Sequence, residues 1–379
     1  MECRRAIRTG TATLLALALL AVGCAPPPAA APAAPAQPPA AQLPAAQAAA
    51  AAQPAAQAPA GQTPAAVGPP DKVVFMAAFK PQANVSFFGA YVAQEKGYYR
   101  EQNLDVEIKH TFQTGEQYKL LAANQLDVTT SSGEDIIKAL LNDGASFLAI
   151  AMLTQRGDRG YTALAESGIR TPRDWEGKTV GYKNFIRPEY LALIQQAGVD
   201  RSKIREVGVG FDPRVLTEKR VDAIPIFLSN EPFLIRKMGY EVNVLDPEEY
   251  GLTLLGQTWI VNAEQLRAKG PIFERWLKAS LQGLNYAFAN EREALDIIMK
   301  YAPQEDREHQ EFMLRTERER SITELTRQNG LGWMTADQWS KAQDMLFEYD
   351  QIKQKAEPSK FYTDQFLRAI YRNGEFIWP

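Results

Sequence analysis

Four side chains belong to the types that most often perform covalent or metal chemistry, and they form no cluster. Cys3 and Cys24 both lie near the start of the 379-residue chain, so the remainder has no cysteine for a disulfide or a thiolate metal site. His110 and His309 are far apart in sequence and are expected to be solvated surface residues. The sequence therefore predicts no catalytic residue, no metal site and no cofactor, and it disfavours a histidine-containing hydrolase triad.

The charge balance excludes another class of partner. The chain has 42 basic and 45 acidic residues, which gives a formal net charge of −3. A balance this close to neutral creates no strong field that would attract a polyanion. We therefore expect no nucleic-acid partner.

The first 24 residues have the pattern of an export signal. Arg4, Arg5 and Arg8 precede an apolar run over residues 11–22, which is too short for an ordinary transmembrane helix. The run ends in LAVGC (20–24), which resembles the bacterial lipobox, so we expect Cys24 to be lipidated on the outer face of the cell membrane. Ordinary secretion with an incidental cysteine is the alternative.

Residues 25–70 are rich in alanine and proline and contain no charged residue. Frequent prolines block helix propagation, and the segment has too little apolar bulk to offset the entropy of ordering its backbone. It is expected to be a disordered linker. A tether of this kind would keep residues 71–379 near a membrane while leaving them free to move above it.

From residue 72 onward, strand-like and helical segments alternate, which is typical of α/β proteins with mainly parallel strands. The expected strands are 73–77, 104–109, 126–129, 147–153, 179–182, 205–209, 221–227, 241–245 and 259–261. The expected helices are 87–96, 115–124, 134–141, 188–197, 216–219, 273–290, 293–301, 307–315, 336–349 and 364–371. Two clusters of such units predict two lobes, lobe 1 at about 71–165 and 260–379 and lobe 2 at about 170–255. Their ligand is expected in the cleft between them, at the carboxyl ends of the strands.

Several motifs, taken in order, resemble one known family. These are GAYVAQEKGYYREQNLDVEI (89–108), LLAANQLDV (120–128), GIRTPRDWEGKTVGY (168–182) and VDA (221–223). They resemble the substrate-binding proteins of ABC importers, in the branch of the riboflavin and thiamine-pyrimidine-precursor binders, which is related to the sulfonate and nitrate binders. The resemblance implies a two-lobed, type II periplasmic-binding-protein-like fold, a small-molecule ligand and an ABC permease subunit as partner. The cysteine-rich motif of a related pyrimidine synthase is absent, so the resemblance disfavours an enzyme.

If this fold holds, the ligand lies among loops that follow strands. The candidate ligand-binding residues are Phe79, Asn84, Phe87, Phe88, Ser131, Ser132, Gln155, Tyr182, Asn184, Phe185, Phe227, Asn230 and Glu231. Aromatic faces, amides and a helix N-terminus suit a planar nitrogen heterocycle, and Glu231 could accept a ring N–H. For each phenylalanine, a place in the core is the alternative. For the serines and Glu231, the alternatives are a helix cap and a surface carboxylate.

The loops favour a flat ring over a small oxyanion, because oxyanion binders need concentrated N–H and arginine donors and these loops offer phenylalanine, tyrosine and amides. Riboflavin is the first candidate, since several aromatics could enclose a three-ring system. A formylaminopyrimidine precursor of thiamine is the second. A pyrimidine-synthase-like enzyme and a ligand-sensing lipoprotein without a transporter are the remaining alternatives.

Overall fold

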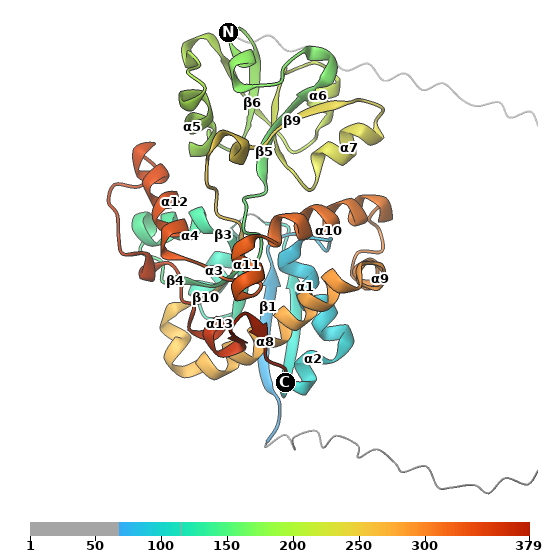
Figure 1. Ribbon diagram of the computed structural model, residues 1–379, viewed down its shortest axis with the longest axis vertical. Helices are drawn as coiled ribbons and strands as arrows, with labels where there is room; N and C mark the ends of the chain where they lie inside the picture. The colour runs from blue at the N-terminus through green and yellow to red at the C-terminus, as the bar shows by residue number, and fades with distance from the viewer. Residues whose placement is uncertain (1–67, 114) are drawn as a thin grey trace, which may run out of the picture. The chain divides into compact units, whose positions relative to one another are not determined.

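The computed structural model describes residues 68–113 and 115–379. The expected signal peptide, Cys24 and nearly all of the expected linker lie outside these residues. We call residues 68–152 and 257–379 the large lobe and residues 159–251 the small lobe (Figure 1). The first crossing (153–158) and the second crossing (252–256) connect them.

The large lobe is built on a five-stranded sheet in the order β2-β1-β3-β10-β4. Its strands are β1 (Asp71–Ala77), β2 (Leu104–His110), β3 (Val128–Ser132), β4 (Phe147–Met152) and β10 (Gln257–Asn262). β1 pairs in parallel with β2 and β3, as the alternation of elements predicts. β10 instead runs antiparallel to β3 and β4, because it is the strand with which the chain returns from the small lobe.

The β4 edge of this sheet is covered by the C-terminal part of the chain. Backbone N–H groups of Ala149 and Met152 donate to the carbonyl oxygens of Phe361 and Gly332, both at 2.9 Å. These bonds satisfy polar groups that an edge strand would otherwise leave open. They also explain how all six residues of β4 are buried at the end of a sheet.

Helices surround this sheet and make up the rest of the large lobe. Those of its first segment are α1 (Val85–Lys96), α2 (Tyr98–Glu101), α3 (Glu116–Ala122) and α4 (Gly133–Asp143). Those of its second segment are α8 (Leu266–Ala289), α9 (Glu291–Tyr301), α10 (Arg307–Ser321), α11 (Glu324–Asn329), α12 (Ala336–Glu348) and α13 (Gln365–Ile370), followed by the hairpin β11 (Tyr371–Arg372) and β12 (Glu375–Phe376). α1 ends at Gly97, whose φ of 80° is the left-handed conformation that glycine favours.

The core between α1, α8 and the sheet is aromatic. Trp276 on α8 lies 5.3 Å from the Phe75 ring and 5.0 Å from the Trp259 ring, measured between centroids. The Trp259 indole N–H donates to the carbonyl oxygen of Ser86 at 2.9 Å, so its polar atom is satisfied. The three rings are buried, and their contacts hold the two sequence segments of the large lobe, 68–152 and 257–379, against each other.

The small lobe contains two sheets. β5 (Arg159–Leu164) lies between β8 (Ile224–Phe227) and β9 (Val242–Leu245) and runs antiparallel to both, and β6 (Thr179–Lys183) pairs in parallel with β7 (Arg205–Val209). Its helices are α5 (Pro188–Gln196), α6 (Arg214–Thr217) and α7 (Glu231–Lys237). The turn before β6 is the short helix Pro172–Trp175, capped reciprocally by Thr171 and Asp174.

Two elements of the small lobe are absent from the sequence expectation. β5 falls in the range expected for lobe 1 (71–165), but its pairing places it with β8 and β9. Its sequence, RGYTAL, has only a short apolar run, so its strand character comes from its position between two other strands. α7 follows the strand end at Phe227 and begins with an acidic residue and a proline, both of which favour a helix start.

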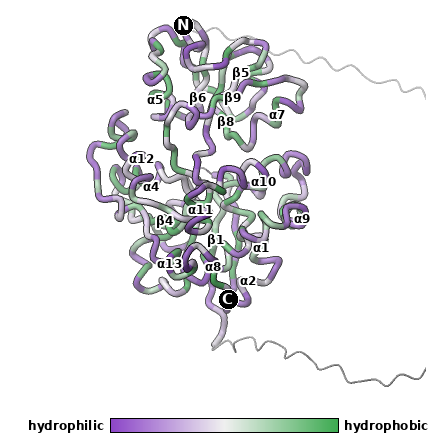
Figure 2. The backbone as a smooth tube through the Cα atoms, viewed as in Figure 1, coloured by the Kyte–Doolittle hydropathy of each residue, from purple (hydrophilic) through white to green (hydrophobic). Residues whose placement is uncertain are grey.

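α10 differs from the other long helices because its sequence is mostly hydrophilic, as its purple trace in Figure 2 shows. Even so, Gln310, Glu317 and Arg320 on this helix are buried. His309 is also buried rather than solvated, with its ring stacked 5.2 Å from Phe233 of α7. Part of the polar surface of α10 thus packs inside the protein instead of facing solvent.

The close approach of α1 and α8 can be tested at Gly283. A Cβ there would overlap the carbonyl oxygen of Gly89 on α1, so Gly283→Ala should force the helices apart and lower the free energy of unfolding by about 1–3 kcal/mol. Gly270→Ala is the control on the same helix, because a Cβ at Gly270 meets no atom within 4 Å apart from its chain neighbours. Thermal unfolding followed by circular dichroism measures both. Equal melting temperatures for the two variants would contradict this account of the packing.

Candidate ligand-binding site

The two crossings between the lobes run side by side. The N–H of Leu153 donates to the carbonyl of Gln257 at 2.6 Å, and the N–H of Gly157 donates to the carbonyl of Leu254 at 3.1 Å. A Cβ on Gly157 would lie 2.5 Å from the Leu254 Cβ, so the crossings need a glycine at this position. The lobes are therefore connected by a paired, closely packed two-stranded link.

Beside this link, the small lobe has a pocket of about 500 Å³, part of it open to solvent. Its wall comes from the first residues of β5, the end of β6 with the loop to α5, the loop after β7 and the end of β8. The lining residues are Arg159, Gly160, Tyr161, Tyr182, Lys183, Asn184, Phe185, Arg187, Glu189, Phe211, Pro225, Ile226 and Phe227.

Four aromatic side chains stand around the pocket at the ends of strands. Tyr182 is the second-last residue of β6, and Phe185 follows that strand. Phe211 follows β7, and Phe227 is the last residue of β8. Phe185 and Phe211 are 42% and 58% exposed, which is unusual for large apolar side chains. Rings held open at a pocket mouth are suited to cover the faces of a flat ligand.

A buried ion pair behind the pocket wall holds two of the lining residues in position. Lys183 Nζ bonds to Glu231 Oε1, and Glu231 Oε2 accepts the N–H of Phe227 at 2.7 Å. Both carboxylate oxygens of Glu231 are thus engaged within the small lobe, so the residue positions Lys183 and Phe227 and does not line the pocket. Lys183 also lies 5.2 Å from the centre of the Phe211 ring.

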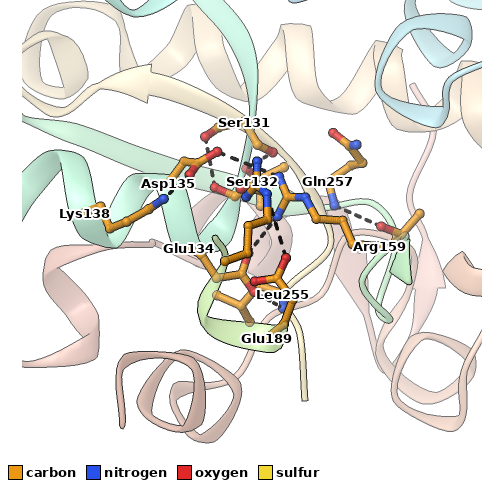
Figure 3. A network of polar contacts seen from close by, with 12 residues as sticks. Ser131, Ser132, Glu134, Asp135, Lys138, Arg159, Glu189, Leu255 and Gln257 are labelled. Carbon is orange, nitrogen blue, oxygen red and sulfur yellow. Dashed lines mark hydrogen bonds and ion pairs between the residues drawn. The ribbon is translucent and has the colours of Figure 1, made fainter. Parts of the chain in front are cut away.

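Charged side chains from both lobes meet beside the pocket (Figure 3). Glu134 and Asp135 begin α4 in the large lobe, and Arg159 of the small lobe approaches their oxygens to 4.0 Å and 3.9 Å. Burial raises the pKa of Glu134 to about 7, against the opposing effect of Arg159. Glu134 Oε1 also accepts the N–H of Leu255 at 2.6 Å, which ties α4 to the second crossing.

The same cluster extends to Phe185. Arg187 lies with its guanidinium carbon 4.9 Å from the centre of the Phe185 ring, and Lys138 Nζ of α4 lies 5.3 Å from it. Lys138 and Arg159 together outweigh the effect of burial and lower the pKa of Asp135. Phe185 therefore has a cation from each lobe near its ring.

A second polar contact joins the lobes on the α10 side. Ser229 Oγ of the small lobe lies 2.7 Å from Asp158 Oδ2 in the first crossing and 3.2 Å from Glu317 Oε1 on α10. Asn84 donates to the same Glu317 oxygen at 3.3 Å. All four residues are buried. Burial raises the pKa of both carboxyl groups, to about 6 for Asp158, and the like charge of Asp158 raises the pKa of Glu317 further.

Four of the residues predicted from sequence line the pocket together, namely Tyr182, Asn184, Phe185 and Phe227. The others lie elsewhere in the structure. Phe79 is exposed after β1, Phe87 is buried, and Phe88 is fully buried in the core of the large lobe. Asn84 caps α1 with its side-chain oxygen.

The remaining predicted residues also lie outside the pocket lining. Ser131 belongs to β3 rather than to a loop, and its hydroxyl bonds to Tyr118 at 2.9 Å. Ser132 and Asn230 precede α4 and α7 without a side-chain cap bond. Gln155 is buried and donates to the carbonyl oxygens of Met152 and Trp333 at 2.8 and 2.9 Å. Its amide thus supports the first crossing.

Nine lining residues are missing from the sequence prediction, and Phe211, Arg159 and Arg187 are among them. Phe211 follows β7, a correctly predicted strand, so the rule that selected Phe185 would have found it. Arg159 begins β5, which was not predicted, and Arg187 immediately precedes α5. The argument that the loops offer phenylalanine, tyrosine and amides therefore did not take account of these two arginines at the start of β5 and before α5.

Membrane-spanning helices and clusters of metal-ligating side chains are both absent from the described residues. Within 68–113 and 115–379, no helix has the length and apolar character needed to span a membrane. In the same residues, no three side chains of histidine, cysteine, aspartate or glutamate lie close enough together to hold a metal ion.

Comparison with known proteins agrees with the arrangement of the lobes. The NMT1/THI5 like family model matches residues 84–294. The chain is 24% identical over 295 residues to the riboflavin-binding protein RibY of Chloroflexus aurantiacus, which covers 75% of this chain and 83% of that protein. It is also 24% identical over 295 residues to the formylaminopyrimidine-binding protein of Halalkalibacterium halodurans, with 75% and 87% covered.

Among solved structures, the periplasmic aliphatic sulphonate binding protein SsuA from Escherichia coli superposes with a TM-score of 0.60 at 14% identity. The match covers 77% of this chain and 91% of SsuA. This likeness shows that the described residues have the α/β, two-lobed fold of the periplasmic binding proteins, as the sequence predicts.

The Asp158 and Glu317 pair makes stability depend on pH. Because burial raises the folded-state pKa of both acids, their protonated forms stabilise the fold fully below the unfolded pKa of about 4. The contribution of Asp158 is lost as pH rises through about 6, and that of Glu317 is lost as pH rises toward its own raised pKa. Glu317→Gln keeps the shape and the acceptor oxygen without the charge. It should reduce the loss of stability between pH 4 and pH 7 by roughly 1–3 kcal/mol.

Melting temperatures measured across this pH range test the prediction, with Glu319→Gln as the control at an exposed position on the same helix. A Glu317→Gln profile that runs parallel to the wild-type profile would show that the pair does not titrate as described.

Proposed function

Because the chain belongs to the NMT1/THI5 like family, we propose that it captures a flat heteroaromatic vitamin, riboflavin in the first place, and delivers it to an ABC permease. The chain is a substrate-binding protein of the ABC-importer type and not an enzyme. Two relatives are named as binding proteins, one for riboflavin and one for formylaminopyrimidine.

The observation that carries the choice of ligand is the set of rings around the pocket. Phe185, Phe211 and Phe227 come from three different strand ends, and Tyr182 adds a phenol beside them. Apolar rings on several sides provide stacking surface for a fused ring system, which a small inorganic anion would leave unused.

A formylaminopyrimidine is the second candidate. The relative that binds this class of ligand is as similar to the chain as the riboflavin binder is, with 24% identity over 295 residues in both cases. A single aminopyrimidine ring would use fewer of the aromatic side chains, for which reason we place it after riboflavin.

We further propose that the protein works on the outer face of the cell membrane, held there by a lipid on Cys24. The lipobox-like segment ending at Cys24 and the uncharged stretch over 25–70 support this arrangement. A ligand bound between the lobes would favour their closed arrangement, and the closed lobes would present the permease with a single docking surface.

Riboflavin binding can be followed by the fluorescence of the flavin ring. Titration of the full chain with riboflavin should quench this fluorescence with a sub-micromolar dissociation constant, because stacking on aromatic rings alters the excited state. Absence of quenching together with heat stabilisation by a formylaminopyrimidine would select the second candidate. No response to either compound would contradict the proposed ligand class.

Phe185 provides a sharper test with a matched control. Phe185→Ala should weaken ligand binding about tenfold or more, since it removes a stacking face, and should leave the melting temperature nearly unchanged. Phe347→Ala is the control: this ring is 44% exposed against 42% for Phe185, and a lysine lies 5.0 Å from its centre, but it is on α12 away from the pocket. Equal affinity for the two variants would exclude Phe185 from the binding site.

A further inference from the structure

The charge of the pocket wall is not explained by an uncharged ring ligand. Among the lining residues, Arg159, Lys183 and Arg187 are cationic and Glu189 is the one carboxylate. Lys183 is neutralised by its bond to Glu231 behind the wall. Two guanidinium groups therefore face the pocket beside a single lining carboxylate.

Both guanidinium groups have only loose contacts with acidic side chains. Arg187 Nε lies 3.9 Å from Glu189 Oε1, and Arg159 approaches Glu134 and Asp135 no closer than 3.9 Å. These distances exceed those of hydrogen bonds, and within residues 68–113 and 115–379 neither guanidinium donates one. A guanidinium has five N–H donors, so most of this donor capacity remains open to a ligand.

The electrostatic balance singles out Arg187 as the less compensated cation. Burial lowers its pKa, and the like charge of Arg159 lowers it further, and together these outweigh the opposing attraction of Glu189, Asp135 and Glu134. For Arg159, burial also lowers the pKa, but Asp135, Glu189 and Glu134 together outweigh it. The pKa of Glu134 is about 7, so part of this compensating charge is absent at neutral pH.

We propose that the ligand carries an anionic group, a phosphate monoester or a carboxylate, which Arg187 binds together with Arg159 while the ring lies against the pocket aromatics. This inference rests on the proposed function, because it adds a charge to the same flat ligand. The guanidinium of Arg187 lies 4.9 Å from the centre of the Phe185 ring, so a ring stacked on Phe185 brings its substituents next to Arg187. Planar guanidinium groups bind such oxyanions through two parallel N–H bonds.

A structural role for the same arginines makes a different prediction. Arg159 faces Glu134 and Asp135 of the large lobe, and such a contact could hold the lobes together whatever ligand is bound. A contact of this kind affects all ligands equally. An anion contact affects only the ligand that carries the charge, so a pair of ligands that differ in one phosphate separates the two roles.

The experiment compares riboflavin with flavin mononucleotide, and an aminopyrimidine with its phosphate monoester, on the full chain by fluorescence and calorimetric titration. We expect the phosphorylated member of the pair that binds to have a dissociation constant at least tenfold lower than its partner. Arg187→Gln should bring this ratio close to one, and Arg187→Lys should retain part of it. Arg318→Gln, on α10 outside the pocket, should leave the ratio unchanged.

Equal affinity for the two members of a pair in the wild-type protein would overturn this inference and leave the proposed function intact. Equal weakening of both members by Arg187→Gln would overturn it as well, because it would assign Arg187 to holding the lobes. Binding of none of the four probes would contradict the proposed function itself, and this inference with it. Melting temperatures of the variants show whether each is folded.

Discussion

The close contact of the two crossing segments is the constraint on which the rest of the structure depends. Their backbones run within hydrogen-bonding distance, and a Cβ on Gly256 would overlap the carbonyl oxygen of Thr154. Glycine at this position and at Gly157 lets two chains pass where one side chain would separate them. Because two paired segments join the lobes, the surface of the small lobe that contains the pocket wall keeps a defined position relative to the large lobe.

Strand ends then determine what the facing surface of the small lobe contains. The ends of β6, β7 and β8 and the beginning of β5, which runs antiparallel to β8, lie at the pocket, so these residues come together although they are distant in sequence. The pairing of β5 with β8 sets Arg159 directly opposite Phe227, which places a cation and a ring side by side. The site thus combines stacking surface with positive charge as a consequence of sheet register.

Polar contacts between the lobes lie on both sides of the link and have different electrostatic character. On the α4 side, acids and bases from the two lobes face each other at about 4 Å, an arrangement that a ligand charge could rebalance. On the α10 side, two carboxyl groups share one hydroxyl, and burial raises the pKa of both. The hydrophilic sequence of α10 follows from this role, since one face of the helix meets polar groups of the small lobe and the crossings.

The amino-acid sequence by itself determined the alternation of strands and helices, the helix end at Gly97 and the capped turn at Thr171, because these depend on local backbone preferences. It also placed Phe185 and Phe227 at strand ends. Only the tertiary structure decided that Phe88 is core while Phe185 is open, since burial depends on the surface that packs against a residue and not on its type. Arg159 entered the site in the same way, through the partners that β5 finds on both of its edges.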